Sequence, residues 1–267
     1  MSKTTNVIGV LVKLSLPLSF MLSSLLITLS SAAEAQCELS PSNLQASYQL
    51  TSSDNSPNVS SKNSSHTSKL NLWRQGNTVA HQYPQTDITE SWFLLNNKQI
   101  KPTRFFDHYQ RGIEYQPGEV VHGKSEHDWS YRYQFISDKL ISQLTLSAET
   151  GKGCERQQIL TQTSANSKIE LVWLPELQLI SRFSWTKNQG KHQTHEQWQL
   201  TELSHDANKI ATFFKQLNHY KMTDYADIGD DHSDEFLTKM VTLGFVEHGA
   251  SGFYDTEGKA ISDGHSH

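Results

Sequence analysis

The segment Asp224–Phe236, DYADIGDDHSDEF, crowds acidic residues together in a way that suggests a metal site. As a calcium-binding EF-hand loop starting at Asp224, it would have Gly229 at the sixth place and Glu235 at the twelfth, as that loop requires. The third and fifth places, however, hold alanine and isoleucine instead of residues with side-chain oxygens. Two missing ligands exclude an EF-hand.

Two interpretations of this acidic segment remain open. The first is a looser divalent-metal site whose candidate ligands are Asp224, Asp227, Asp230, Asp231 and His232. The second is a helix entrance, in which Asp231, Ser233, Asp234 and Glu235 accept hydrogen bonds from free backbone amides and complement the positive end of the helix dipole. We favour the helix entrance.

The sequence does not bring the groups needed for catalysis together. HGASGF, at His248–Phe253, resembles a serine nucleophile elbow only in part, because its second glycine is misplaced and it follows an expected helix. Phosphate-binding and dinucleotide-binding glycine motifs are absent, and no pair of carboxylates falls in an expected cleft. We therefore expect a protein that is not an enzyme and needs no cofactor.

Aromatic residues alternate in the segment Asp128–Leu146, where they would share one face of a β-strand. Together with two tryptophans further along the chain they form a tentative ligand-binding set: Trp129, Tyr131, Tyr133, Phe135, Trp173 and Trp185. These side chains either fill the core of a sheet or line a cavity for an apolar ligand, as in small barrels and half-barrels.

The first 35 residues have the layout of a secretory signal, with lysines, an apolar run and small residues at Ala33 and Ala35. No later run is apolar enough to cross a bilayer, so we expect an exported mature chain with no transmembrane segment, periplasmic in a Gram-negative bacterium. The only two cysteines, Cys37 and Cys154, should form a structural disulfide in that oxidising compartment.

Charge is distributed unevenly along the chain. Residues 36–220 contain 18 Lys and Arg against 17 Asp and Glu, a net charge of +1, whereas residues 221–267 contain 3 against 10, a net charge of −7. The chain lacks the basic excess that attracts nucleic acid or anionic lipid surfaces, so neither is expected as a partner.

Alternating apolar and polar residues predict a long antiparallel meander between Lys69 and Leu203. Its expected turns lie at Gly76-Asn77, Asn96-Asn97, near Ser137-Asp138, at Ser164–Ser167, Pro175-Glu176 and Asn188–Gly190. The predicted fold class is mainly β with C-terminal helices: a meander of roughly nine to eleven strands forming a half-barrel or barrel covered by two short helices.

The chain is expected to divide into three parts. Residues 1–35 are the signal peptide. Residues 36–220 form the antiparallel β domain, with a mobile Ser/Asn-rich loop at 52–68 and a packed helix near 206–218. Residues 221–267 form an acidic C-terminal segment with a short helix at about 233–243 and a flexible end.

Two segments, LWRQGNTVAHQY at 72–83 and IELVWLPELQLISRFSW at 169–185, followed by helices, resemble the periplasmic lipoprotein-localisation carriers. This resemblance implies a half-barrel whose apolar concave face holds acyl chains and is covered by helices. The block from Asp224 to Asp255 also looks like bacterial envelope proteins of unknown function.

We therefore expect an exported envelope binding or accessory protein, whose curved sheet presents an apolar pocket to a lipid-like ligand or a protein partner. Two alternatives remain: a non-catalytic structural or protein-interaction module with a filled core, and a divalent-metal binding protein that uses the acidic C-terminal segment. The sequence does not indicate an oligomeric state.

Overall fold

The computed structural model describes residues 36–55, 64–118, 126–190, 192–228, 233–242, 253–254 and 260–261. All of them belong to one compact unit, Glu34–His267. No helix in these ranges is long and apolar enough to span a membrane.

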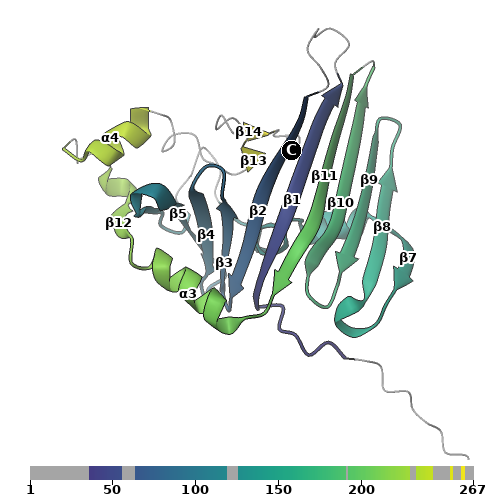
Figure 1. Ribbon diagram of the computed structural model, residues 1–267, viewed down its shortest axis with the longest axis horizontal. Helices are drawn as coiled ribbons and strands as arrows, with labels where there is room; N and C mark the ends of the chain where they lie inside the picture. Colours follow the sequence, from purple (N-terminus) through teal and green to yellow (C-terminus); the bar gives the residue numbers. More distant parts are fainter. Residues whose placement is uncertain are drawn as a thin grey trace, which may run out of the picture. The chain divides into compact units, whose positions relative to one another are not determined.

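A single large sheet dominates the fold (Figure 1). Its strands are β1 (Asn43–Asn55), β2 (Ser64–Gln75), β3 (Thr78–Tyr83), β4 (Ile88–Leu94), β5 (Ile100–Phe106), β6 (Arg111–Glu114), β7 (Thr145–Thr150), β8 (Gln157–Thr163), β9 (Ser167–Leu174), β10 (Leu179–Gln189), β11 (His192–Ser204) and β12 (Lys221–Asp224). The helices are α1 (Trp129–Gln134), α2 (Asp138–Gln143), α3 (Ala207–Leu217) and α4 (Glu235–Thr242), with short 3-10 turns η1 (Asp107–Tyr109), η2 (Gly153–Glu155) and η3 (Tyr225–Asp227). A separate pair joins β13 (Phe253–Tyr254) to β14 (Ala260–Ile261).

The strand order is β12-β6-β5-β4-β3-β2-β1-β11-β10-β9-β8-β7. Two antiparallel meanders, β1 to β6 and β7 to β11, meet where β1 pairs with β11. The chain crosses between them through α1 and α2, and β12 then adds to β6 in the parallel sense. The sheet is open, with β7 and β12 at its edges, which confirms the predicted mainly β, half-barrel class and rules out a closed barrel.

Most of the predicted turns are confirmed because their signals are local. Gly76 has a φ of +59°, the left-handed conformation that favours glycine in the tight turn between β2 and β3. The turn at Asn96-Asn97 joins β4 to β5, and those at Ser164–Ser167, Pro175-Glu176 and Asn188–Gly190 separate β8 to β11.

The hairpin predicted over Asp128–Leu146 is wrong, because this segment forms α1 and α2. The Asp128 side chain accepts a hydrogen bond from the Tyr131 amide and caps α1, while the Ser137 side chain accepts one from the Leu140 amide and caps α2. Phe135, with a φ of +64°, ends α1. Because both helices are capped in this way, the segment is helical although its aromatic side chains alternate as they would in a strand.

The Ser/Asn-rich range expected as a loop is shorter than the predicted 52–68. β1 continues to Asn55 and pairs with β2 from Ser64 onward, while residues 56–63 lie outside the described ranges. The predicted helix near 206–218 is confirmed as α3, capped by Asp206, and the shorter C-terminal helix as α4.

The sheet has two faces that bury different clusters. On the inner face, Leu72, Val79 and Trp92 belong to a core that is completed by Phe135 and Ile136 from the α1–α2 crossover. The same face continues onto β4, β5 and β6, where Ile88, Phe106 and Ile113 pack against Leu237 and Met240 of α4.

On the outer face, Trp73, Ala80 and Phe105 pack against Ile210, Phe214 and Leu217 of α3. Residues that lie directly opposite on neighbouring strands share a face, and the pairings place these side chains on the side opposite Leu72 and Val79. The helices therefore cover both faces, with α1, α2 and α4 on the inner one and α3 on the outer one.

Candidate binding face

An apolar row crosses the inner face from the centre of the sheet to one edge. Cross-strand pairing sets its six members side by side on consecutive strands: Leu50, Trp198, Phe183, Leu171, Leu160 and Leu146. Leu171 is 0% exposed and Leu160 is 6% exposed, whereas Leu146, on the edge strand β7, is 51% exposed. The row is therefore covered in its middle and open at its end.

The α1–α2 crossover covers the middle of the inner face. The ring of Phe135 meets Tyr48 at 5.5 Å and Trp198 at 5.6 Å, both edge to face. Leu140 and Ile141 of α2 pack against the same core while remaining half-buried. Phe183 and Trp185 of β10 also pack against this core and are half-buried.

The structure divides the aromatic residues that were predicted to bind a ligand. Phe135 and Trp173 are buried in the core of the inner face, and Trp129 and Trp185 pack against that core while staying partly exposed. Tyr131 and Tyr133 lie on α1, half-buried, instead of beside Phe135 on a strand. Trp129, Trp185 and Phe183, which precedes Trp185 on the same face of β10, thus keep part of their aromatic surface exposed beside the inner-face core.

The inner face becomes polar from Trp185 onward, where Glu196 of β11 stands directly opposite and accepts a 2.6 Å hydrogen bond from Trp198 Nε1. Lys187 follows on the same face of β10, directly opposite Thr194 of β11 and Ser167 of β9. All three side chains are half-buried. A polar end therefore adjoins the partly open apolar surface.

A buried polar row, which the sequence did not reveal, lies under α1. His81, Glu90 and Arg104 stand opposite one another on β3, β4 and β5 and are all buried. Glu90 lies 3.5 Å from Arg104, and the Nε2 of His81 donates a hydrogen bond to the Arg132 carbonyl oxygen at 2.7 Å. The Arg132 guanidinium stacks 4.4 Å from the Trp92 ring.

Burial changes the protonation of this row. It lowers the pKa of His81 well below 6.5, and the nearby cations Arg132 and Arg74 lower it further. It raises the pKa of Glu90 above 4.5, an effect that Arg104 and Arg132 partly offset. The closed inner face therefore favours a neutral histidine.

Asp234, near the end of the acidic segment, forms the entrance of α4. The Asp234 carboxylate accepts hydrogen bonds from the amides of Phe236 and Leu237 at 3.0 and 3.2 Å, and pairs with Arg111 at 2.8 Å. Hydrogen bonds from Arg111, with those amides, lower the pKa of Asp234 to about 2. The predicted capping by this segment is confirmed at Asp234.

The candidate metal ligands are placed only in part. Asp224 accepts hydrogen bonds from the Ala226 amide and from Gln116, and Asp227 is exposed in η3. Asp230, Asp231 and His232 lie outside the described residues. Among the residues that are described, no three His, Cys, Asp or Glu side chains cluster as metal ligands would, and the metal site stays a prediction.

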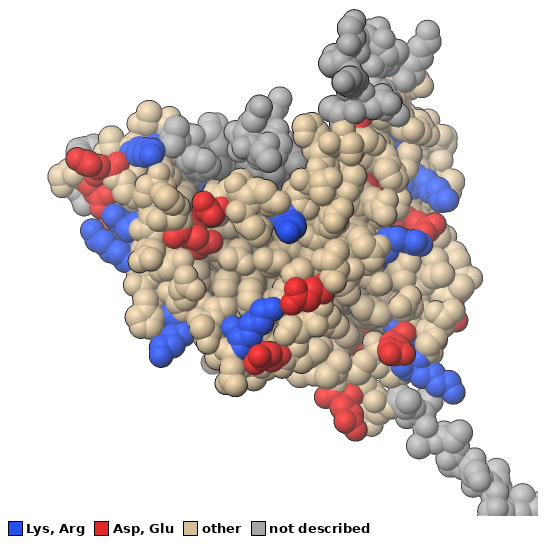
Figure 2. All heavy atoms as spheres, in the orientation of Figure 1, with Lys and Arg blue, Asp and Glu red and all other residues tan. Residues whose placement is uncertain are grey.

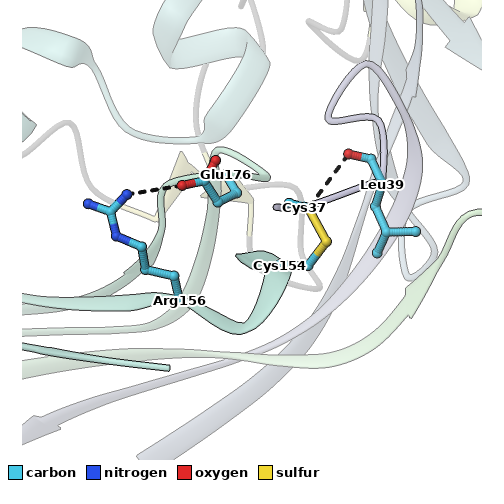
Figure 3. Close-up of a disulfide and its surroundings, with 5 residues drawn as sticks. All are labelled: Cys37, Leu39, Cys154, Arg156 and Glu176. Carbon is cyan, nitrogen blue, oxygen red and sulfur yellow. Dashed lines mark hydrogen bonds and ion pairs between the residues drawn. A yellow bond between two sulfur atoms is a disulfide. The ribbon is translucent and has the colours of Figure 1, made fainter. Parts of the chain in front are cut away.

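The predicted disulfide between Cys37 and Cys154 is present, with a Cα–Cα distance of 4.5 Å (Figure 3). It ties the start of the described chain to η2, the turn between β7 and β8. Beside it, Arg156 pairs with Glu176 at 3.0 Å.

On the outer face of the sheet, a shallow hollow of about 300 Å³ lies between α3 and η1, lined by Gln110, Thr212, Lys215, Gln216, His219 and Tyr220.

Basic and acidic residues are interspersed on the face of the molecule shown in Figure 2, where the coloured residues form no large patch of one sign. This agrees with the near-neutral count over residues 36–220.

No protein-family model matches the chain, and no curated protein matches it. Among solved structures, the MucA/MucB complex of Pseudomonas aeruginosa matches at 13% identity over 60% of this chain and 51% of that chain, with a TM-score of 0.28. A putative outer membrane lipoprotein-sorting protein domain from Vibrio parahaemolyticus matches at 8% identity over 66% and 92%, with a TM-score of 0.29. PNGF-II matches at 10% identity over 67% and 31%, also with a TM-score of 0.29.

The match to a lipoprotein-sorting domain agrees with the resemblance predicted from the strand pattern. The chain spans only about half the length of the MucA/MucB chain that it matches. With TM-scores of 0.29 or lower, these likenesses do not assign a function to the chain.

Proposed function

We propose that this protein is a non-catalytic binding protein of the bacterial envelope and that the inner face of its sheet holds an apolar ligand with an acyl chain. The observation that carries the proposal is the pair of aromatic side chains Phe183 and Trp185 on β10, which pack against the inner-face core while staying partly exposed. Binding sites for apolar ligands are concave and lined by aromatic and aliphatic side chains of this kind.

The ligand's polar head would lie at the Lys187 end of this surface. An acyl chain along Trp185 and Phe183 buries apolar area at roughly 25 cal/mol per Å². Lys187, Ser167 and Thr194 offer a cation and two hydroxyl groups at the point where the apolar surface ends. The proposed ligand class is therefore an acyl chain with a carboxylate or phosphate head.

The disulfide supports the location. Disulfides persist in oxidising compartments and are rare in the bacterial cytosol. The Cys37–Cys154 bond fits an exported chain, in agreement with the signal layout of residues 1–35. The buried row His81, Glu90 and Arg104 is closed off beneath α1, so it supports packing of the inner face more directly than it supports catalysis.

Native mass spectrometry of the oxidised protein after incubation with oleate tests the proposal. We expect one bound fatty acid on the wild type and loss of that species in Trp185→Ala. Phe93→Ala is the matched control, because Phe93 is an exposed aromatic residue on the outer face of β4, and it should retain the ligand. Absence of any fatty acid adduct on the wild type would contradict the proposal.

A further inference from the structure

The two edges of the sheet differ in how they are protected. β12 is a four-residue strand that carries Lys221 and Asp224, and short, charged edge strands discourage pairing with other chains. β7 has six residues, all exposed; it contains no Lys, Arg or Pro, and its one charged residue, Glu149, is paired with Arg156. Within the described part of the chain it pairs only with β8.

The apolar row of the inner face ends abruptly at β7. Leu160 on β8 is 6% exposed, but its partner Leu146 is 51% exposed, and β7 is the last of the described strands on this side of the sheet. The single irregularity of β7 is a bulge between Leu146 and Ala148, where Ser147 is held by a 2.8 Å hydrogen bond to Thr161. The outward edge of β7 therefore presents backbone groups and a large aliphatic side chain together.

A disulfide and ion pairs hold the β7–β8 hairpin in place. Cys154, in the turn after β7, is bonded to Cys37. Arg156, at the start of β8, pairs with Glu149 of β7 at 3.1 Å and with Glu176 of the β9–β10 turn at 3.0 Å. An exposed strand held in this way loses little further freedom when another strand binds it, which favours association.

We propose that β7 is the acceptor edge for an extended segment of a partner protein, which adds to the sheet as a further strand. On its outward side, β7 has no strand partner among the described residues, so its backbone N–H and C=O groups there would pair with an extended backbone. Leu146 dictates an aliphatic or aromatic side chain on the inner side of that segment. Thr145 and Thr150, which point to the outer face, dictate polar residues there.

This inference is independent of the acyl ligand. The ligand surface centres on Trp185 of β10, whereas the acceptor edge centres on Leu146 of β7, three strands away in the sheet order. Trp185→Ala should therefore abolish fatty acid binding without affecting strand addition, and Leu146→Lys should do the reverse. The two proposals can fail separately.

The test is hydrogen exchange of the oxidised full chain with a synthetic strand. The probe is an acetylated, amidated peptide of alternating threonine and valine, six residues long to match β7. At about 1 mM probe, we expect backbone amides of residues 145–150 to exchange roughly tenfold more slowly, and exchange elsewhere to stay unchanged. The effect should disappear in Leu146→Lys and persist in Phe93→Lys, whose parent side chain is a similarly exposed 43%.

Three results would overturn the proposal. The first is unchanged exchange of β7 in the wild type with the probe. The second is equal slowing by a probe whose amides are N-methylated along one edge, because that would indicate apolar contact without strand pairing. The third is protection that grows with protein concentration and needs no probe, because the occupant would then be a second copy of this chain. Unaltered unfolding temperatures would show that both lysine variants fold.

Discussion

The guanidinium carbon of Arg74 lies 3.8 Å from the centre of the Tyr133 ring, and Arg74 Nε donates a hydrogen bond to the carbonyl oxygen of Tyr133 at 2.8 Å. Arg74 is 0% exposed, and its other nitrogens donate to the carbonyl oxygens of Pro41, Leu177 and Gln178. One buried cation thus fastens α1, the start of the described chain and the β9–β10 turn to the sheet. Its partners are backbone dipoles and an aromatic ring.

Replacing Arg74 with methionine should destabilise the protein by at least about 3 kcal/mol, because several buried carbonyl groups lose their donor at once. The free energy of unfolding from urea denaturation measures this. Arg182→Met is the control, since Arg182 is an exposed residue on the outer face that pairs only with Glu170, and it should cost less than about 1 kcal/mol. Equal effects of the two substitutions would contradict the role assigned to Arg74.

Acidification should loosen the inner face through His81. Its pKa in the folded protein lies well below 6.5, so the unfolded chain takes up a proton first as the pH falls below that value, and stability falls with it. The groups facing His81 are Arg132, Arg74 and Glu90. Between about pH 7.5 and about pH 5.5 we expect a loss of roughly 1 kcal/mol, measured by urea denaturation, that His81→Gln removes.

Glu90 should act in the opposite direction. Because its folded pKa is raised above 4.5, the folded protein takes up this proton before the unfolded chain does, and the contribution of Glu90 to stability rises as the pH falls. Glu90→Gln should therefore steepen the loss on acidification, whereas His108→Gln, on an exposed residue, should leave it unchanged. An equal loss of stability on acidification in the wild type, Glu90→Gln and His108→Gln would contradict this explanation.

Asp234 should control how α4 is held on the sheet. Asp234→Ala removes both the helix cap and the ion pair to Arg111, and we expect faster hydrogen exchange over residues 235–242, equivalent to about 1 kcal/mol for the cap. Because the pKa of Asp234 is lowered to about 2, its contribution should persist down to acidic pH and vanish only as the pH falls from 3.8 through that value. Asp227→Ala, on an exposed residue of η3, should change nothing in α4.

The disulfide should contribute more than any single side chain. It links residues 117 apart, and closing a loop of that length restricts the unfolded chain by about 4 to 5 kcal/mol in the chain-entropy model. The double variant Cys37→Ser/Cys154→Ser should lose about that much free energy of unfolding. Equal free energies of unfolding for the double variant and the oxidised wild type would contradict a stabilising role of the disulfide.

The parts of the fold that could be predicted from sequence are those with local signals. Gly76, Asn96-Asn97 and Pro175-Glu176 mark turns by their own conformational preferences, and Asp206 marks the start of α3. The hairpin predicted from Trp129 to Phe135 was wrong because a short sequence with alternating aromatic residues is compatible with a strand and with a short capped helix. The caps at Asp128 and Ser137 were the signals that could have corrected it.

The buried polar residues could not be predicted, because strand register decides their neighbours. Nothing in the local sequence around His81, Glu90 or Arg104 shows that they lie opposite one another, since that depends on two successive hairpin registers. The hydrogen bonds of Arg74 could not be predicted either, because its acceptors come from residues up to 104 positions away. The open end of the apolar row at Leu146 depends on which strand forms the edge.

The measurement that tests the central claim most directly is quenching of tryptophan fluorescence by a brominated fatty acid. Of the six tryptophans, Trp73 lies on the outer face beneath α3, and the others belong to the inner-face core or pack against it. We predict saturable quenching in the wild type that persists in Trp73→Phe and falls markedly in Trp185→Phe. Quenching that is absent, or that is lost in Trp73→Phe and retained in Trp185→Phe, would contradict an acyl-binding inner face.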